Sequence, residues 1–219
     1  YASAESLSYF MYQKPKTAKR MYFDVIPKAV DEYHQQLRAY ETQDEKARLN
    51  NPVWHIHNGH VPKSDMVISF AMLLNLASVS SAETKETLWG FIQRYVPGSG
   101  PESHPSMDQA VGFAVRYYND FVKPTKTYRT ASKVEQQALE ALRDALIAHD
   151  GAVDDETLQS IVYAEGRERF DPLRDWFTAI YEVLLGSSQG PRFGGFIALY
   201  GVDETVKLID EALSGKLVP

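Results

Sequence analysis

The stretch Phe23–Tyr40, FDVIPKAVDEYHQQLRAY, decides the fold class of this chain. Its hydrophobic residues recur at steps of three and four, at Phe23, Ile26, Ala29, Val30, Tyr33 and Leu37. This spacing places them on one face of an amphipathic α-helix. The same pattern continues through most of the chain, whereas the alternation that is typical of strands is nearly absent. We therefore predict an all-α fold with about nine to ten helices.

Capping residues and glycines indicate where these helices begin and end. Ser64 and Ser81, each followed closely by an acidic residue, are expected to cap the helices that come after them. The last two helices are expected at 193–200 and 203–213, separated by Gly201.

The composition is that of an ordinary globular protein, with 44% hydrophobic and 24% charged residues in 219. The longest apolar run, 66–79, is too short and too polar to span a bilayer, so we expect a buried helix and no membrane partner. The absence of cysteine excludes disulfides and thiolate metal sites and fits a cytoplasmic location. Because helix signals start immediately after Tyr1, we expect a segment of a longer protein.

Positive charge is concentrated in two acid-poor segments, although the net charge of −6 is unusual for a domain that binds nucleic acid. The first segment, 13–23, has no acidic residue and four cations, namely Lys14, Lys16, Lys19 and Arg20. The second segment, 116–133, has five cations and one acid, Asp120. Such runs are usually solvated helix faces, but they also suit contact with phosphates.

The stretch Gly186–Gly201, GSSQGPRFGGFIALYG, places an arginine and three aromatic residues among glycines. Arg192 and Phe193 follow a proline turn, so a cation and a ring stand at the start of the next helix. Such a pair can contact phosphate and stack on an exposed base. The alternative interpretation is that Phe193, Phe196 and Tyr200 fill a core, which is usual for aromatic residues at helical spacing.

The sequence contains no catalytic pattern that we recognise. His55, His57 and His60 lie in one short loop, but zinc ligands usually come from separate elements with an acid or thiolate nearby, so we predict no metal site. Nucleophile elbows, zinc-protease helices and phosphate-binding glycine loops are also missing from the sequence. We therefore predict no catalytic residue in this chain.

Five stretches are together more specific than any single motif: FMYQKPK at 10–16, YFDVIP at 22–27, NPVWHIH at 51–57, DFVKP at 120–124 and GPRFG at 190–194. Through them the chain resembles, over essentially its whole length, the C-terminal portion of the class I lysyl-tRNA synthetases. The resemblance implies a helical stem-contact segment at 1–50. It implies at 51–219 an α-helix cage similar to the anticodon-binding domain of glutamyl-tRNA synthetases.

The resemblance also implies a function, namely binding of tRNA(Lys) by a part of a lysine–tRNA ligase. The catalytic domain, with its ATP and Mg²⁺, would precede this chain and be its second partner. The chain alone would then lack the ATP and amino-acid sites, hold no cofactor and be inactive. Neither DNA nor a membrane is expected as a partner.

Anticodon bases splay out of their loop and are recognised by stacking and by hydrogen bonds to their edges. We expect such contacts from four residues, namely Arg192, Phe193, Trp176 and Tyr200. Phosphate contacts, which position the RNA, are expected from Lys14, Lys16, Lys19 and Arg20. A non-catalytic protein–protein interaction module is the alternative, and it gains if Arg192 is buried in an ion pair and its aromatic neighbours all lie in the core. A standalone helical enzyme would need a pocket of clustered titratable groups.

Overall fold

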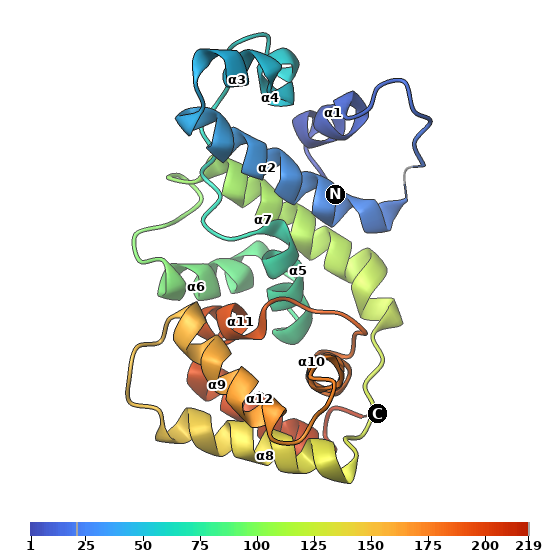
Figure 1. Cartoon of the computed structure of the whole chain (residues 1–219), viewed down its shortest axis with the longest axis vertical. Helices are drawn as coiled ribbons and strands as arrows, with labels where there is room; N and C mark the ends of the chain where they lie inside the picture. Colours follow the sequence, from blue (N-terminus) through green and yellow to red (C-terminus); the bar gives the residue numbers. More distant parts are fainter. Residues whose placement is uncertain (21, 219) are drawn as a thin grey trace.

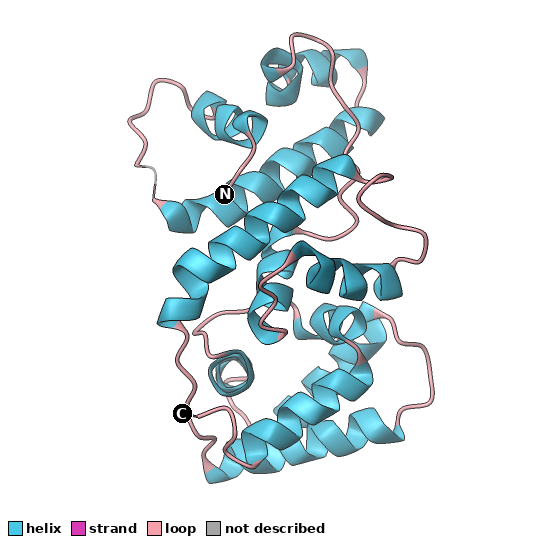
Figure 2. Ribbon diagram, turned by 180° about the vertical axis from the view of Figure 1, so that it is seen from behind, coloured by secondary structure: helices cyan, strands magenta, loops and turns pink. Residues whose placement is uncertain are grey.

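The computed structural model describes residues 1–20 and 22–218, and within them every regular element is a helix (Figure 1, Figure 2). The α-helices are α1 (Ala4–Tyr12), α2 (Ile26–Thr42), α3 (Glu45–Asn50), α4 (Pro52–Ile56), α5 (Phe70–Val79), α6 (Lys85–Tyr95), α7 (Pro105–Tyr117), α8 (Lys133–Ala148), α9 (Asp155–Arg167), α10 (Arg174–Ile180), α11 (Phe193–Tyr200) and α12 (Val202–Leu213). The all-α prediction is confirmed. The described part has more helices than expected because short ones such as α3 and α4 carry little periodicity.

The helices form an elongated molecule with α1–α4 at one end, α5–α7 in the middle and α8–α12 at the other end (Figure 1). One large hydrophobic cluster joins α8–α12, and a second joins α5–α7 with Val30 of α2. Helix α11 contributes Phe196 to the first cluster and Leu199 to the second. The turn that precedes α11 is therefore fixed at the junction between the middle and lower parts.

Local capping accounts for several helix boundaries. Ser132 and Glu135 form a capping box at the start of α8, and Asp154 accepts hydrogen bonds from two backbone N–H groups of α9. Gly186 ends the helical segment after α10 with a left-handed φ of 65°, a conformation that glycine adopts without steric cost.

The expected caps at Ser64 and Ser81 are wrong. Helix α5 begins only at Phe70, where the N-cap is Ser69, and α6 begins after Thr84. Tertiary contact moves the start of α5, because the Asp31 carboxylate of α2 accepts the backbone N–H of Phe70 at 2.6 Å and that of Ala71 at 3.1 Å. The segment before α5 instead runs as irregular chain between α4 and α5 (Figure 1).

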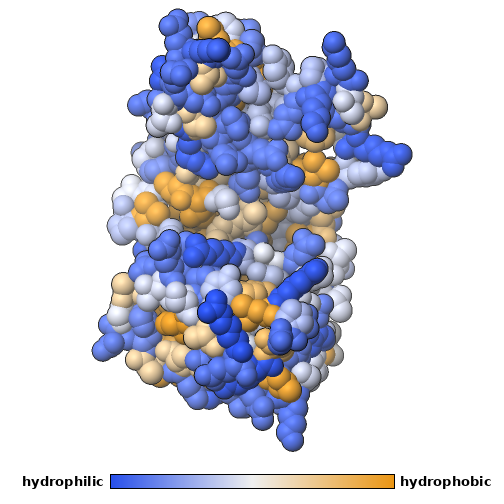
Figure 3. Space-filling view, in the orientation of Figure 1, coloured by the Kyte–Doolittle hydropathy of each residue, from blue (hydrophilic) through white to orange (hydrophobic). Residues whose placement is uncertain are grey.

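The proposed division at residue 50 stays a prediction. Tyr33 and Leu37 of α2 pack with Val53 of α4, so a small hydrophobic cluster spans this position. Among the described helices, none combines the length and the hydropathy that crossing a membrane requires. Figure 3 shows hydrophobic side chains in the middle of one face and in several patches of its lower part, whereas the upper end is mostly hydrophilic.

Candidate nucleic-acid interface

The turn before α11 presents Arg192 on the surface. The Tyr181 hydroxyl donates a hydrogen bond to the Pro191 carbonyl at 2.8 Å and so holds the turn against the lower part of the molecule. Arg192 is the N-cap residue of α11, and 54% of its side chain is exposed. Its Nη1 lies 3.5 Å from Oδ2 of Asp155, which is also exposed. Exposed pairs of this kind contribute little to stability, so the guanidinium remains open to an anion.

Gly194, the glycine after Phe193, lets α11 cross α9 at backbone contact. A Cβ atom there would lie 2.4 Å from the Asp155 carbonyl oxygen and 2.4 Å from the Gln159 nitrogen. The Gly194 N–H donates to the Gln159 side-chain oxygen at 2.8 Å, and this bond is buried. Gly194 therefore has a packing role, and Arg192, two positions before it, lies on the surface.

The structure corrects the expected stacking role of Phe193 and Trp176. Both side chains are 0% exposed and belong to the core that joins α8–α12. The Trp176 indole N–H donates to the Val162 carbonyl at 3.0 Å, and its ring packs against Gly166, where a Cβ would come within 2.2 Å. A ring that is closed on all sides by protein cannot receive a base, so the core interpretation holds for Phe193 and for Phe196, which is also 0% exposed, and Trp176 is a core residue as well.

Tyr200 is only partly buried, at the C-terminal end of α11. Its ring stacks on Phe196 with centroids 5.2 Å apart and on Phe91 of α6 at 5.5 Å. Burial raises the pKa of the Tyr200 hydroxyl to about 12, so it stays protonated as a hydrogen-bond donor at neutral pH.

Residues 13–20 of the first cationic segment project from the body of the molecule after α1 (Figure 1). Lys14, Lys16 and Arg20 are exposed, and within the described residues no carboxylate lies at ion-pair distance from them. Lys19 differs, because its Nζ donates to the Phe10 carbonyl and lies 4.8 Å from the centre of the Phe10 ring. Lys19 thus anchors the segment and leaves three free cations on it.

Three of the five cations of the second cationic segment are engaged inside the structure. Arg129 donates to Glu135 at 2.7 Å and to Glu182 at 2.6 Å, and the bonds from Arg129 hold the pKa of Glu135 down at about 2. Lys123 pairs with Glu83. Lys126 donates to a carbonyl at 2.6 Å, and burial lowers its pKa to about 8. These three cations therefore connect helices, whereas Arg116 and Lys133 are exposed and make no ion pair within the described residues.

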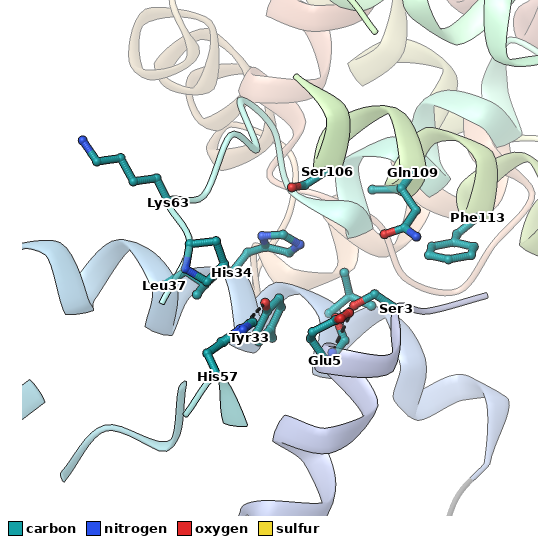
Figure 4. A pocket seen from close by; sticks show the side chains of 14 residues that line it. Ser3, Glu5, Tyr33, His34, Leu37, His57, Lys63, Ser106, Gln109 and Phe113 are labelled. Carbon is teal, nitrogen blue, oxygen red and sulfur yellow. Dashed lines mark hydrogen bonds between the residues drawn. The ribbon is translucent and has the colours of Figure 1, made fainter. Parts of the chain in front are cut away.

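The histidine loop lies beside a cavity of about 240 Å³ between α1, α2 and α7 (Figure 4). His57 Nε2 makes a 2.9 Å hydrogen bond with the Tyr33 hydroxyl, and His34 Nδ1 makes one of 3.1 Å with the Ser64 hydroxyl. His55 instead bonds the Leu49 carbonyl at 2.9 Å. Within the part of the chain that the structure describes, no three metal-ligating side chains converge.

His34 makes stability depend on pH. It is 7% exposed, and desolvation by burial lowers its pKa from 6.5 to about 4. Below pH 6.5 His34 is therefore protonated in the unfolded chain, whereas in the folded chain it stays neutral down to about pH 4. The free energy of unfolding falls as pH falls through this window. We expect a loss of about 2 kcal/mol between pH 7.5 and pH 5 from this one group.

Urea unfolding of the chain and of His34→Gln at these two pH values measures this contribution. The variant should lose clearly less stability on acidification, while His60→Gln, which removes an exposed histidine, should behave like the parent. Equal pH dependence in all three proteins would show that His34 does not carry the effect.

Sequence reasoning missed Phe91 and Arg94 of α6. The guanidinium carbon of Arg94 lies 4.6 Å from the centre of the Phe91 ring, next to Tyr200. The only local signal was a phenylalanine and an arginine three positions apart near a helix end, which is too common to single out.

The chain is similar to known proteins along its whole length, and these define its class. Residues 1–60 match the family model of the class I tRNA synthetases (K). The whole chain is 77% identical over 218 residues to lysine–tRNA ligase of Roseobacter denitrificans (strain ATCC 33942 / OCh 114). It is 45% identical over 216 residues to the lysine–tRNA ligase of Rickettsia bellii (strain OSU 85-389) and 44% identical to that of Rickettsia felis (strain ATCC VR-1525 / URRWXCal2).

These matches cover 100%, 97% and 97% of this chain, which spans 41% of the length of each relative. The chain corresponds, along its whole length, to the C-terminal part of the class I lysine–tRNA ligases.

Proposed function

We propose that this chain is the tRNA-binding part of a lysine–tRNA ligase, which attaches lysine to tRNA(Lys) at the expense of ATP. The observation that carries the proposal is the projecting segment with three free cations, Lys14, Lys16 and Arg20, on a chain that is otherwise acidic. Free cations on a protruding segment suit the phosphates of an RNA backbone. In this proposal ATP, Mg²⁺ and lysine bind outside this chain, the chain alone is inactive, and the ligase acts in the cytoplasm.

Two residues support a second contact, with unpaired bases of the anticodon loop. Arg192 stands exposed at the N-terminus of α11, and Tyr200 reaches the surface at its other end. Phe193 and Trp176 are buried, so they are left out of the proposed interface and serve as its support.

A first experiment tests the phosphate contacts. Changing Lys14, Lys16 and Arg20 together to alanine removes about three phosphate partners. The log–log dependence of tRNA affinity on salt should then become shallower by about 2, at 0.7 per contact with single-stranded RNA. The affinity itself should also fall, and more so at low salt because screening is weaker there.

The matched control changes Lys46, Arg174 and Lys216 to alanine, which removes the same charge from exposed positions elsewhere. Filter binding of tRNA(Lys) over a range of salt concentrations measures both slopes. If the two triple variants bind alike, net charge explains the result and the segment has no specific role. If the parent chain shows no salt-dependent binding at all, the tRNA-binding proposal itself fails.

A specific observation also favours contact with protein. Leu7 and Met11 of α1 and Tyr22 and Phe23 before α2 are large apolar side chains that are between 43% and 59% exposed, and Leu7 and Tyr22 line one small apolar pocket. We propose that the catalytic part of the ligase covers this surface. The protein–protein contact that the interaction-module alternative expects would then be made by this one face of a tRNA-binding chain. Loss of ligase activity in a full-length Leu7→Asp, Met11→Asp variant that still binds tRNA would support this contact, and full activity would contradict it.

A further inference from the structure

A column of stacked planar groups runs from the core to the surface between α6 and α11. Phe193 stacks on Phe196 with ring centroids 5.5 Å apart, and Phe196 stacks on Tyr200 at 5.2 Å. Tyr200 stacks on Phe91 at 5.5 Å, and the three ring pairs are inclined by only 22° to 25°. The Arg94 guanidinium, 4.6 Å from the Phe91 ring centre, forms the outermost layer.

The inner end of this column is fixed and the outer end is accessible. Phe193 and Phe196 are 0% exposed, whereas Arg94 is exposed on the last turn of α6. Arg94 Nε donates to the Gly90 carbonyl at 3.2 Å, which holds the guanidinium over the ring. Nothing lies within 4 Å of the position that a Cβ of Gly90 would take, so there is open space beside the column. Such a surface is ordered before any ligand arrives, which lowers the entropic cost of binding.

The charge of Arg94 is not compensated. In the described part of the chain, no carboxylate lies within ion-pair distance of its guanidinium. Glu204 is near enough to affect the Tyr200 hydroxyl, but it pairs with Lys207 at 3.1 Å. A free guanidinium on an aromatic stack attracts the negative charge of a nucleic acid and offers a flat face on which a base can stack.

We propose that the outer end of this column, where the Arg94 guanidinium lies over the Phe91 ring with Tyr200 beneath it, is a stacking site for one unpaired base of the bound RNA. The base adds a layer on the outer face of the Arg94 guanidinium, which itself lies over the Phe91 ring. A paired base in a helix is excluded, because neighbouring bases already cover both of its faces. This inference rests on the proposed tRNA-binding function and adds to it a site whose two α6 residues lie outside the GPRF turn.

An unpaired base could come from the anticodon loop or from the single-stranded 3′ end of the tRNA. Two RNA hairpins separate these sources. One carries the fluorescent base 2-aminopurine in the anticodon loop, and the other carries it in the unpaired 3′ end of an acceptor stem. Stacking quenches the emission of 2-aminopurine, so the parent chain should quench one hairpin and leave the other bright. Binding of both RNAs without any quenching would overturn the proposal.

Variants then assign the quenching to this column. Arg94→Ala should weaken binding of the quenched hairpin about tenfold and restore its emission, as expected for the loss of one stacked base. Arg94→Lys keeps the charge but not the planar group, so the hairpin should also regain its emission when it binds this variant. Arg167→Ala is the matched control, because Arg167 is an exposed arginine of α9 that lies 5.6 Å over the ring of Tyr163.

The results distinguish the proposed stacking site from the proposed tRNA-binding function. If Arg94→Ala and Arg167→Ala bind the hairpins equally well and both keep the quenching, the stacking site is refuted while tRNA binding stands. If the parent chain binds neither the hairpins nor intact tRNA, the proposed function itself fails. Circular dichroism and melting curves show whether each variant is folded. Because Arg94 is exposed, its substitutions should change neither the spectrum nor the melting temperature.

Discussion

Gly194→Ala is expected to destabilise the chain by about 3 kcal/mol, at the upper end of the range for an overpacked core. The new Cβ would lie 2.4 Å from the Asp155 carbonyl oxygen, 2.4 Å from the Gln159 nitrogen and 2.6 Å from the Gln159 Cα. All three atoms are backbone, so no side chain can rotate away and α9 must move as a whole. The movement would also break the buried hydrogen bond from Gly194 to Gln159.

Thermal unfolding followed by circular dichroism measures this effect. A loss of this size corresponds to a decrease in Tm of about 6–12 °C for a chain of this length. Gly90→Ala is the control, because Gly90 lies within α6 and a Cβ there would meet nothing within 4 Å. Helix propensity should make that control neutral or slightly more stable, by up to about 1 kcal/mol. Equal melting temperatures for the two variants would contradict the close crossing of α9 and α11.

Trp176→Ala is expected to cost about 3–5 kcal/mol, as is usual for removing a large buried aromatic residue. The indole is 0% exposed and makes a hydrogen bond to the Val162 carbonyl, so the variant leaves both a cavity and an unpaired carbonyl. Phe170, which stacks on Trp176 at 5.4 Å, would lose its partner as well.

This second experiment also separates a structural from an RNA-binding role for Trp176. Urea unfolding gives the loss of stability, and tRNA affinity is measured at a temperature where the variant is still folded. We expect unchanged affinity, whereas a direct stacking role would reduce it about tenfold. Ile147→Ala, at a position that is 64% exposed, should change stability by no more than about 0.5 kcal/mol.

The parts of the fold that could be predicted from the sequence are those that local interactions determine. The apolar period of 23–40 corresponds to α2, and Ser132 caps α8 through atoms only three residues away. Gly186 ends its helix because of its own backbone preference. The predicted helix at 193–200 coincides with α11, which also ends at a glycine with positive φ, Gly201.

The starts of α5 and α6 show where local reasoning fails. Ser64 is a good capping residue, yet α5 starts six positions after it, because Asp31 supplies acceptors for the first N–H groups of α5. Thirty-nine residues separate Asp31 from Phe70, so no window of the sequence contains both. The pairing of Arg129 could not be predicted for the same reason, since its partner Glu182 lies far along the chain.

The sequence by itself determined that the chain is helical, which residues are apolar and where the first group of cations lies. Only the tertiary structure decided which aromatic residues are available to a ligand. Trp176 and Phe193 are closed in the core, while Tyr200 emerges beside Phe91 and Arg94. The physical reason is that helix periodicity depends on near neighbours, whereas exposure and stacking depend on how α11 docks between α6 and α9, and this docking requires backbone contact at Gly194.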